Sequence, residues 1–329
     1  NVIKDQNGFS SSGNWYKGNL HSHTVNSDGK LTPEESVRLF REHGYSFLCF
    51  SEHDLYTDYR SEFDCEDFII LPGLEASVAL CEEEAPHKKL KVHHIHGILG
   101  TEQMQKAAGE HVFREKEAIK PAKLYGTWDG AGEAQKLCDY LRSRGCLTIY
   151  NHPVWSRAEA EEFIDTEGLW ALEIFNYGTV NESNTGYDYL SWDRMLRKGK
   201  RITAVAADDN HNEGFFDDAC GGYIVVRADR LSHEEILKNM ISGNYYSSAG
   251  PEIYGWGIKD QTAWVECSPV YRIDFIAGNH INDGRALVCG SYKGTLQRGE
   301  YELRGDEAYI RVQVSDRYGR TAWTNAIHL

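Results

Sequence analysis

The chain has 329 residues, of which 41% are hydrophobic, and it carries a formal net charge of -15 at pH 7. This length suffices for one large α/β domain with a small companion, or for two mid-sized domains. The acidic balance and the lack of any block of five or more Lys/Arg argue against a nucleic-acid polymer as partner. A small anionic substrate would need local positive charge, which bound metal ions can supply.

The eight cysteines form no C-x-x-C pair, and several lie inside apolar runs such as residues 47–50. We interpret them as reduced core residues, which predicts a cytoplasmic protein, with disulfides as the alternative. The sequence has no 18-residue apolar run and no basic-then-apolar start. Neither a membrane span nor an intact signal peptide is therefore expected.

The first hundred residues predict short strands and a helix. Apolar runs end at Leu20, cover residues 45–50 and cover residues 68–71, and each leads into a polar cluster. Between the first two runs, residues 32–35 offer a capping box with a proline at the first helical position, and Gly44 ends the predicted helix.

The middle of the chain continues this alternation. Helices are predicted over about residues 133–144 and 232–243, and apolar runs at residues 147–150, 172–175 and 202–207 predict strands. Because the runs are short and rich in Ile, Val, Phe and Leu, they suit strands buried on both faces of a parallel sheet. The alternation predicts a βαβ architecture, which places its chemistry at the carboxyl ends of the strands.

After about residue 250 the pattern changes. Apolar segments at residues 271–277, 308–314 and 322–327 are separated by turn signals, and residues 309–314 alternate partly with period two. That period is typical of a half-buried antiparallel strand. We therefore predict an α/β domain over residues 1–250 and a small β-rich domain over residues 251–329.

The sharpest local signal for chemistry is the H-x-H sequence of His21 and His23, followed by Asp28. Residues i and i+2 of a strand point to the same side, so both imidazoles could reach one metal ion. Asp28 could bind the same ion or a neighbouring one, although Asp-Gly is also an ordinary turn dipeptide.

Further candidate ligands follow the other predicted strands. They are His53, Glu75, His152, Asp209 and His211. Each of these residues alone could have an ordinary structural role. It is their shared position at the ends of predicted strands that indicates a site. A mixture of His and carboxylates suits Mn²⁺, Fe²⁺ or Zn²⁺, and the number of ligands exceeds one coordination sphere, so two or three divalent ions are expected.

Residues 93–96 add three more histidines. If they lie on a strand, His94 and His96 share one face and His93 points to the other, so at most one pair is a candidate.

With these residues in place, the sequence resembles the polymerase and histidinol phosphatase (PHP) superfamily of metallophosphoesterases. The matching motifs occur in order across about residues 18 to 211. They are Asn19-Leu20-His21-Ser22-His23 with Asp28-Gly29, Ser51-Glu52-His53-Asp54, Pro72-Gly73-Leu74-Glu75, His94-Ile95-His96-Gly97, His152-Pro153 and Asp209-Asn210-His211.

The resemblance implies a distorted (β/α)7 barrel holding two or three divalent metals. The implied sets are His21, His23, Glu75 and Asp209 for one ion, Asp28, His53 and His211 for a second, and Glu75, His94 and His152 for a third. The sequence departs from the family at Ser51-Glu52, where Thr-Asp is usual. The segment between Glu75 and the next ligand is also longer than is usual in the family, and it contains several candidate histidines. We select His94 rather than His96 as the expected ligand.

These observations predict a metal-dependent phosphoesterase, with no catalytic group beyond the metal ligands. In the expected reaction, a hydroxide that bridges the metal ions would attack a small phosphomonoester or a nucleotide-type phosphodiester. The residues expected to bind substrate are Arg157, Trp155, Tyr56 and Asn176. An exposed Arg and core aromatics are the alternatives for the first three.

Two other functions stay open. The same site could hydrolyse a carbamate or carboxylic ester, or the chain could be a non-catalytic module that its metals stabilise. Occupation of every expected ligand position favours catalysis. The expected partner is a small phosphorylated substrate, with no membrane, and the oligomeric state is left open.

Overall fold

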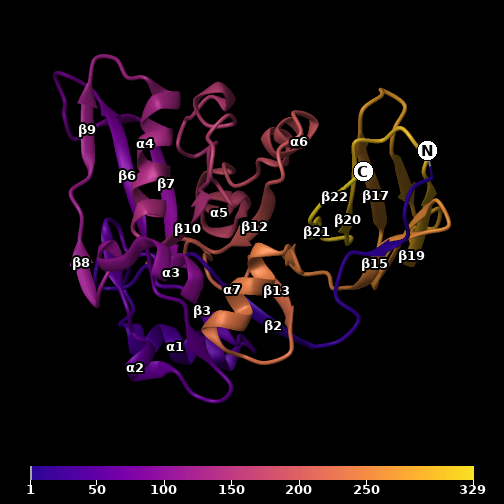
Figure 1. Ribbon diagram of the computed structural model, residues 1–329, viewed down its shortest axis with the longest axis horizontal. Helices are drawn as coiled ribbons and strands as arrows, with labels where there is room; N and C mark the ends of the chain where they lie inside the picture. The colour runs from indigo at the N-terminus through magenta and orange to yellow at the C-terminus, as the bar shows by residue number, and fades with distance from the viewer. Residues whose placement is uncertain (1) are drawn as a thin grey trace.

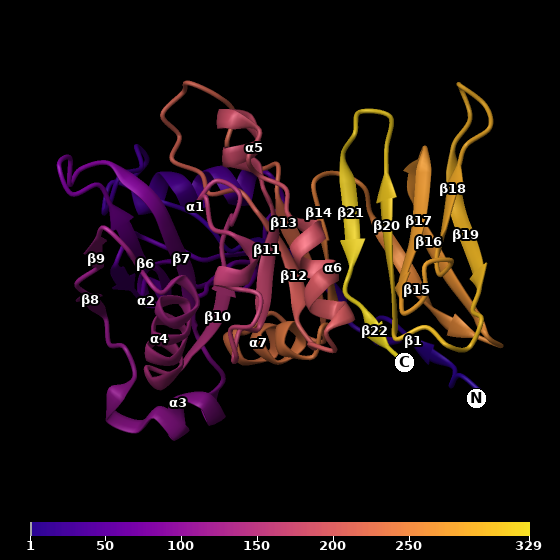
Figure 2. The ribbon, with the colours of Figure 1, turned by 90° about the horizontal axis from the view of Figure 1, so that it is seen from above.

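The computed structural model describes residues 2–329, as an α/β half with a β-rich half beside it (Figures 1 and 2). The α-helices are α1 (Pro33–Glu42), α2 (Arg60–Phe63), α3 (Glu102–Ala108), α4 (Gly130–Ser143), α5 (Tyr177–Ser183), α6 (Tyr189–Arg197) and α7 (His233–Ile241). Two 3₁₀ helices cover Gly109–His111 and Ala160–Glu162. None of the helices within residues 2–329 is both long and apolar enough to cross a membrane.

The helix ends follow the predicted capping chemistry. Thr32 accepts a hydrogen bond from the Glu35 amide at the start of α1, and Ser232 accepts one from the Glu235 amide at the start of α7. Helix α4 begins earlier than predicted, at Gly130, because Asp129 is the residue that caps it.

One sheet carries most of the α/β half. Its strands are, in spatial order, β12 (Thr203–Ala207), β11 (Ala171–Asn176), β10 (Cys146–Tyr150), β7 (Lys89–Leu99), β6 (Gly73–Cys81), β4 (Leu55–Thr57) and β8 (Lys116–Ala118), with β9 (Ala122–Tyr125) pairing with β6. Strands β10, β11 and β12 are parallel, whereas β7 runs antiparallel to both β6 and β10.

A second sheet runs from the α/β half into the β-rich half. Its order is β18 (Arg285–Val288), β17 (Arg272–Gly278), β20 (Tyr309–Ser315), β21 (Thr321–Thr324), β14 (Tyr245–Ser248), β13 (Tyr223–Ala228), β2 (Asn14–Asn19), β3 (Phe47–Leu48) and β5 (Ile69–Ile70), with β22 (Ile327–His328) beside β20. A third sheet contains β1 (Gln6–Asn7), β15 (Ile253–Lys259), β16 (Thr262–Val270) and β19 (Leu296–Glu302).

The mixed α/β class and the β-rich C-terminal half agree with the sequence analysis, but a closed (β/α)7 barrel is not confirmed. The antiparallel strands β6 and β7 interrupt the parallel order, and hydrogen-bonded pairing within residues 2–329 leaves separate sheets. Isolated backbone bridges between the two α/β sheets are Ser22–Asn210 and His53–Glu75, and the Ala206 amide on β12 also donates to Ser247 Oγ on β14 at 3.2 Å. The predicted all-parallel sheet is therefore replaced by a mixed one.

The two halves are joined by strand pairing and by a buried ion pair. Strand β14 pairs with β21, and β1, from the start of the chain, pairs with β15. Arg311 on β20 is fully buried and binds Asp193 on α6 through two hydrogen bonds of 2.8 Å. The domain division at residue 250 stays a prediction.

Candidate metal centre

Backbone pairing brings the H-x-H and D-x-H segments side by side. The Asp209 amide donates to the His21 carbonyl at 2.9 Å, and the His23 amide donates to the Asn210 carbonyl at 3.0 Å. Asn19, at the end of β2, donates from its side chain to Asn210 Oδ1 and to the His21 carbonyl. Two segments almost two hundred residues apart in sequence thus form one short parallel ladder at the site.

Backbone hydrogen bonds also position the candidate ligands His53 and His152. The Asp54 amide donates to the Glu75 carbonyl at 2.8 Å, which sets His53 beside β6. The Asn151 amide donates to the His94 carbonyl at 2.9 Å, which sets His152 beside β7. Gly29 allows the Asp28 loop to fold back, because a Cβ there would lie 2.3 Å from the His23 carbonyl oxygen.

The first group consists of His21, His23, Glu75 and Asp209, whose ligand atoms lie within 4.8 Å of one another. Asp209 Oδ1 is 3.0 Å from Nε2 of both His21 and His23, and Glu75 Oε2 is 3.0 Å from His21 Nε2. Its membership coincides with the first ligand set that the family resemblance implies.

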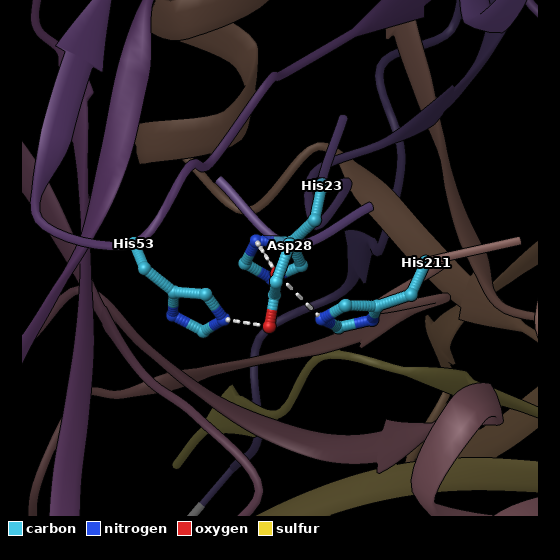
Figure 3. Close-up of side chains that lie close together, drawn as sticks. All are labelled: His23, Asp28, His53 and His211. Carbon is cyan, nitrogen blue, oxygen red and sulfur yellow. Dashed lines mark ion pairs between the residues drawn. The ribbon is translucent and has the colours of Figure 1, made fainter. Parts of the chain in front are cut away.

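The second group places Asp28 among three imidazoles, as Figure 3 shows. Its carboxylate is 3.2 Å from His53 Nε2 and 3.1 Å from His211 Nε2, while His23 Nδ1 lies 3.9 Å away. The histidines come from three different chain segments, so their convergence on one carboxylate is a property of the fold. The group contains His23 in addition to the three residues of the implied second set.

The third group consists of His53, Glu75 and His94, with Glu75 at 3.3 Å from His53 Nδ1 and 3.5 Å from His94 Nδ1. His152 Nε2 lies 3.3 Å from Glu75 Oε2. His96 is engaged elsewhere, because its Nε2 bonds the Leu20 carbonyl and its Nδ1 faces Asn151. His94, rather than His96, is therefore the one that offers a nitrogen to Glu75.

The donor atoms fit divalent metals because many of them are buried without a hydrogen-bond partner. Within residues 2–329 these atoms are His21 Nε2, both ring nitrogens of His23, Glu75 Oε1, His94 Nδ1 and Asp209 Oδ1. Leaving buried polar atoms unsatisfied is costly, and proteins do so where a ligand completes them. Imidazole and carboxylate together suit Mn²⁺, Fe²⁺ or Zn²⁺.

The protonation states of His23, His94 and Glu75 suit metal binding. Burial, with a smaller effect from His53, lowers the pKa of His23 to about 3, and burial lowers that of His94 to about 4, so both rings are neutral and able to bind a cation. Burial alone would raise the pKa of Glu75, but His21 and His94 outweigh it and hold that pKa well below its usual range. Glu75 is therefore a carboxylate.

His211 behaves differently. Burial would lower its pKa, but the Asp28 and Asp209 carboxylates raise it to about 10. A metal ion held by His211 would have to displace the proton that this ring holds at neutral pH.

Sequence reasoning missed the residues that orient the ligands. Glu173 accepts from His21 Nδ1 at 2.7 Å and from the His152 amide at 3.1 Å, and Asn151 donates to Glu75 Oε2 at 2.7 Å. A signal for Glu173 was present, since it lies between Leu172 and Ile174 in a buried strand, where a carboxylate needs partners.

The backbone is strained at two candidate ligands. His152 has φ of 25° and Asp209 has φ of 58°, both in the left-handed region that L-residues rarely adopt. Such strain costs on the order of 1–3 kcal/mol per residue and gathers at functional sites.

Replacing Glu173 with Gln is expected to weaken metal binding by roughly 10–100-fold, because the hydrogen bond that fixes the His21 ring loses its charge. Isothermal titration with Mn²⁺ or Zn²⁺ measures this. The matched control is Glu167→Gln, which changes an exposed carboxylate away from the cluster. Equal affinity in the two variants would show that Glu173 does not orient a ligand.

The cluster opens into a cavity of about 250 Å³. Its lining contains Asp28, His53, Glu75, His94, His152, Asp209 and His211, whereas His21 and His23 are fully buried. Trp155 lines the same cavity, with its ring centroid 4.9 Å from that of His152.

The structure places the other three predicted substrate-binding residues outside this lining. Tyr56 is buried and stacks on Phe113 at 4.9 Å. Arg157 donates to the carbonyls of Val154 and Trp155 in its own loop. Asn176 is buried and donates to Glu173 and to Asp209 Oδ2, so it holds a predicted ligand instead of facing the cavity. Their placement gives no support to substrate binding.

No protein-family model matches the chain, and no curated protein matches its sequence. The chain is similar to solved structures at low identity. One, from Bacteroides vulgatus, is described as a two-domain protein containing a predicted PHP-like metal-dependent phosphoesterase, with 12% identity, a TM-score of 0.44, and coverage of 99% of this chain and 98% of that one.

Two more solved structures are similar over part of the chain. A candidate metal-dependent phosphoesterase from Bifidobacterium adolescentis has 13% identity and a TM-score of 0.37, covering 62% of this chain and 91% of its own. An amidohydrolase from Chromobacterium violaceum, solved with bound sulfate and no metal, has 13% identity and a TM-score of 0.39, covering 69% and 96%.

Proposed function

We propose that the protein is a metal-dependent hydrolase of phosphate esters. The observation that carries the proposal is the convergence of nine imidazoles and carboxylates, from segments spread over residues 21–211, in one cluster, with seven of them lining one cavity. A site that served only to stabilise the fold would need no opening, whereas a catalytic metal site keeps a position for substrate.

Two or three divalent ions would be held by the overlapping groups around His23, Asp28 and Glu75. Bound there, they supply positive charge that polarises an ester oxygen and lowers the pKa of water. The chain's own residues keep His21 oriented through Glu173 and keep Asp209 in place through Asn176.

The cavity favours a small substrate. Its volume of about 250 Å³ lies below the range usual for drug-sized ligands, so a polymer could enter only by its end. Within the described residues no Lys or Arg lines the cavity, so a phosphate group would depend on the metals for binding as well as for reaction.

Metal analysis with turnover assays tests the proposal. The purified protein is expected to bind two or more divalent ions per chain and to hydrolyse 4-nitrophenyl phosphate or bis(4-nitrophenyl) phosphate in added Mn²⁺. A chelator should abolish activity and Mn²⁺ should restore it. The preferred substrate distinguishes monoester from diester hydrolysis.

Other outcomes point to the alternatives. Metal-dependent hydrolysis of 4-nitrophenyl acetate without phosphate release would replace the proposal by a carboxylic ester hydrolase. Bound metal that raises the melting temperature but supports no hydrolysis would indicate a metal-stabilised module. A cytoplasmic location is part of the proposal, supported by the eight unpaired cysteines, five of them buried.

A further inference from the structure

Two carboxylates at the cavity have no partner. Glu182 on α5 and Glu213 in the loop after His211 both line it, and both are exposed. Within residues 2–329 neither makes an ion pair or a side-chain hydrogen bond, whereas Asp218, which also lines the cavity, accepts from the His211 and Asn212 amides. The charges of Glu182 and Glu213 are therefore available to a ligand.

Aromatic rings accompany these carboxylates. Trp155, Phe215 and Phe216 line the same cavity, and Phe215 is 83% exposed. Phe215 and Phe216, which are adjacent in sequence, both leave apolar surface in water beside the cavity. Aromatic faces together with carboxylates form the environment that attracts organic cations, through the ring quadrupole and through charge.

The structure holds the two parts of this rim together. Tyr177 on α5 donates to Asp217 Oδ2 at 2.6 Å, and Asn181 on α5 donates to the Asp217 carbonyl at 2.7 Å. Helix α5 and the loop that carries Glu213 and Phe215 are thus tied to each other. These two hydrogen bonds hold together the two chain segments that carry the rim residues.

The charge pattern divides the cavity into two ends. At its base, carboxylates are surrounded by imidazoles and would be neutralised by metals. At its rim, negative charge is not offset, because no Lys or Arg of the described chain lines the cavity. A substrate with a second phosphate or carboxylate at its outer end would meet repulsion, whereas one with a cationic outer end would meet attraction.

We propose that the rim formed by Glu182, Glu213, Trp155, Phe215 and Phe216 selects esters whose organic part carries a cation, of the alkylammonium class. This proposal rests on the proposed function only in placing the ester group at the metals. It makes the rim the part of the protein that determines specificity.

A matched pair of substrates tests the rim. Choline phosphate and 3,3-dimethylbutyl phosphate share the same phosphate and nearly the same shape, and differ in one positive charge. With the Mn²⁺-loaded protein, kcat/KM is expected to be about tenfold higher for choline phosphate, because the carboxylate charges attract the cation and hold it against the aromatic rings. Equal values for the two esters would overturn the proposal.

Variants locate the effect. In the double variant Glu182→Gln/Glu213→Gln the preference should fall to near one, and in Phe215→Ala it should fall by roughly threefold. The control Glu110→Gln alters an exposed carboxylate that does not line the cavity, and it should keep the full preference. If the preference persists in the double variant, it arises from another part of the protein, and the proposed role of the rim is wrong.

A binding measurement separates this proposal from the proposed function. Isothermal titration of the Mn²⁺-loaded protein with choline and with 3,3-dimethylbutanol requires no hydrolysis. Tighter binding of choline, lost in the double variant, would support the rim even if no ester were hydrolysed. Hydrolysis without any preference for the cationic ester would be consistent with the proposed phosphoesterase function but would contradict the proposed role of the rim. Binding of neither choline nor 3,3-dimethylbutanol would also contradict that role.

Discussion

Replacing Glu75 with Gln is expected to lower metal-dependent turnover by about a thousandfold, equivalent to roughly 4 kcal/mol. This carboxylate lies 3.0–3.5 Å from ring nitrogens of His21, His23, His53, His94 and His152, so it takes part in most of the cluster. Gln keeps the shape but removes the charge that the cations need. Elemental analysis should show fewer metals per chain, and kcat should fall with the metal content.

The matched control is Glu307→Gln. Glu307 is also buried and hydrogen-bonded, to Tyr301 and to the amides of Arg304 and Gly305, but it lies in the β-rich half. The Glu307→Gln substitution should lower the free energy of unfolding without changing the metal content. Full turnover and unchanged metal content in Glu75→Gln would contradict the role given to the cluster.

Replacing Asp193 with Ala is expected to lower the free energy of unfolding by about 3–5 kcal/mol. Arg311 is 0% exposed, and its Nε and Nη2 both donate to Asp193 at 2.8 Å, so the variant leaves a guanidinium buried against Trp192 with Gln313 as its remaining partner. Urea unfolding measures the loss.

Two further variants serve as controls for the buried ion pair. Glu266→Ala removes a partner from Arg298 in a surface pair with side chains 62% and 50% exposed, and it should cost less than about 1 kcal/mol. The double variant Asp193→Leu/Arg311→Met removes both charges and should recover much of the stability. A loss in Asp193→Ala as small as that of the surface control would show that the pair does not hold the two halves together.

The sequence pointed to the segments that the structure brings together, but not to the order of the strands. Most ligand segments could be found because they follow an apolar run, and strand ends of an α/β protein gather at one edge. His94 lies inside β7 and was chosen through the family resemblance. The order of the strands could not be found, since β6 and β7 are separated by the polar residues 82–88 and carry no short hairpin signal. Their antiparallel pairing is decided by tertiary packing, which is why the barrel prediction is not confirmed.

The substrate-binding residues show the same limit. Tyr56 and Arg157 are near ligands in sequence, but their side chains turn into the core and back onto their own loop. Glu213 and Phe215 follow His211 directly, yet only the folded loop shows that they face the cavity. Proximity in sequence does not fix side-chain direction.

The pairing of β1 with β15 has a consequence for how the chain folds during synthesis. Gln6 pairs with Ile258, so β1 cannot form its ladder until the chain has been synthesised past residue 258. All nine predicted metal ligands are made before that point, the last being His211. We expect the α/β half to collapse around its cluster first, with the N-terminal strand joining the β-rich half as a late event in a slow, non-local folding reaction.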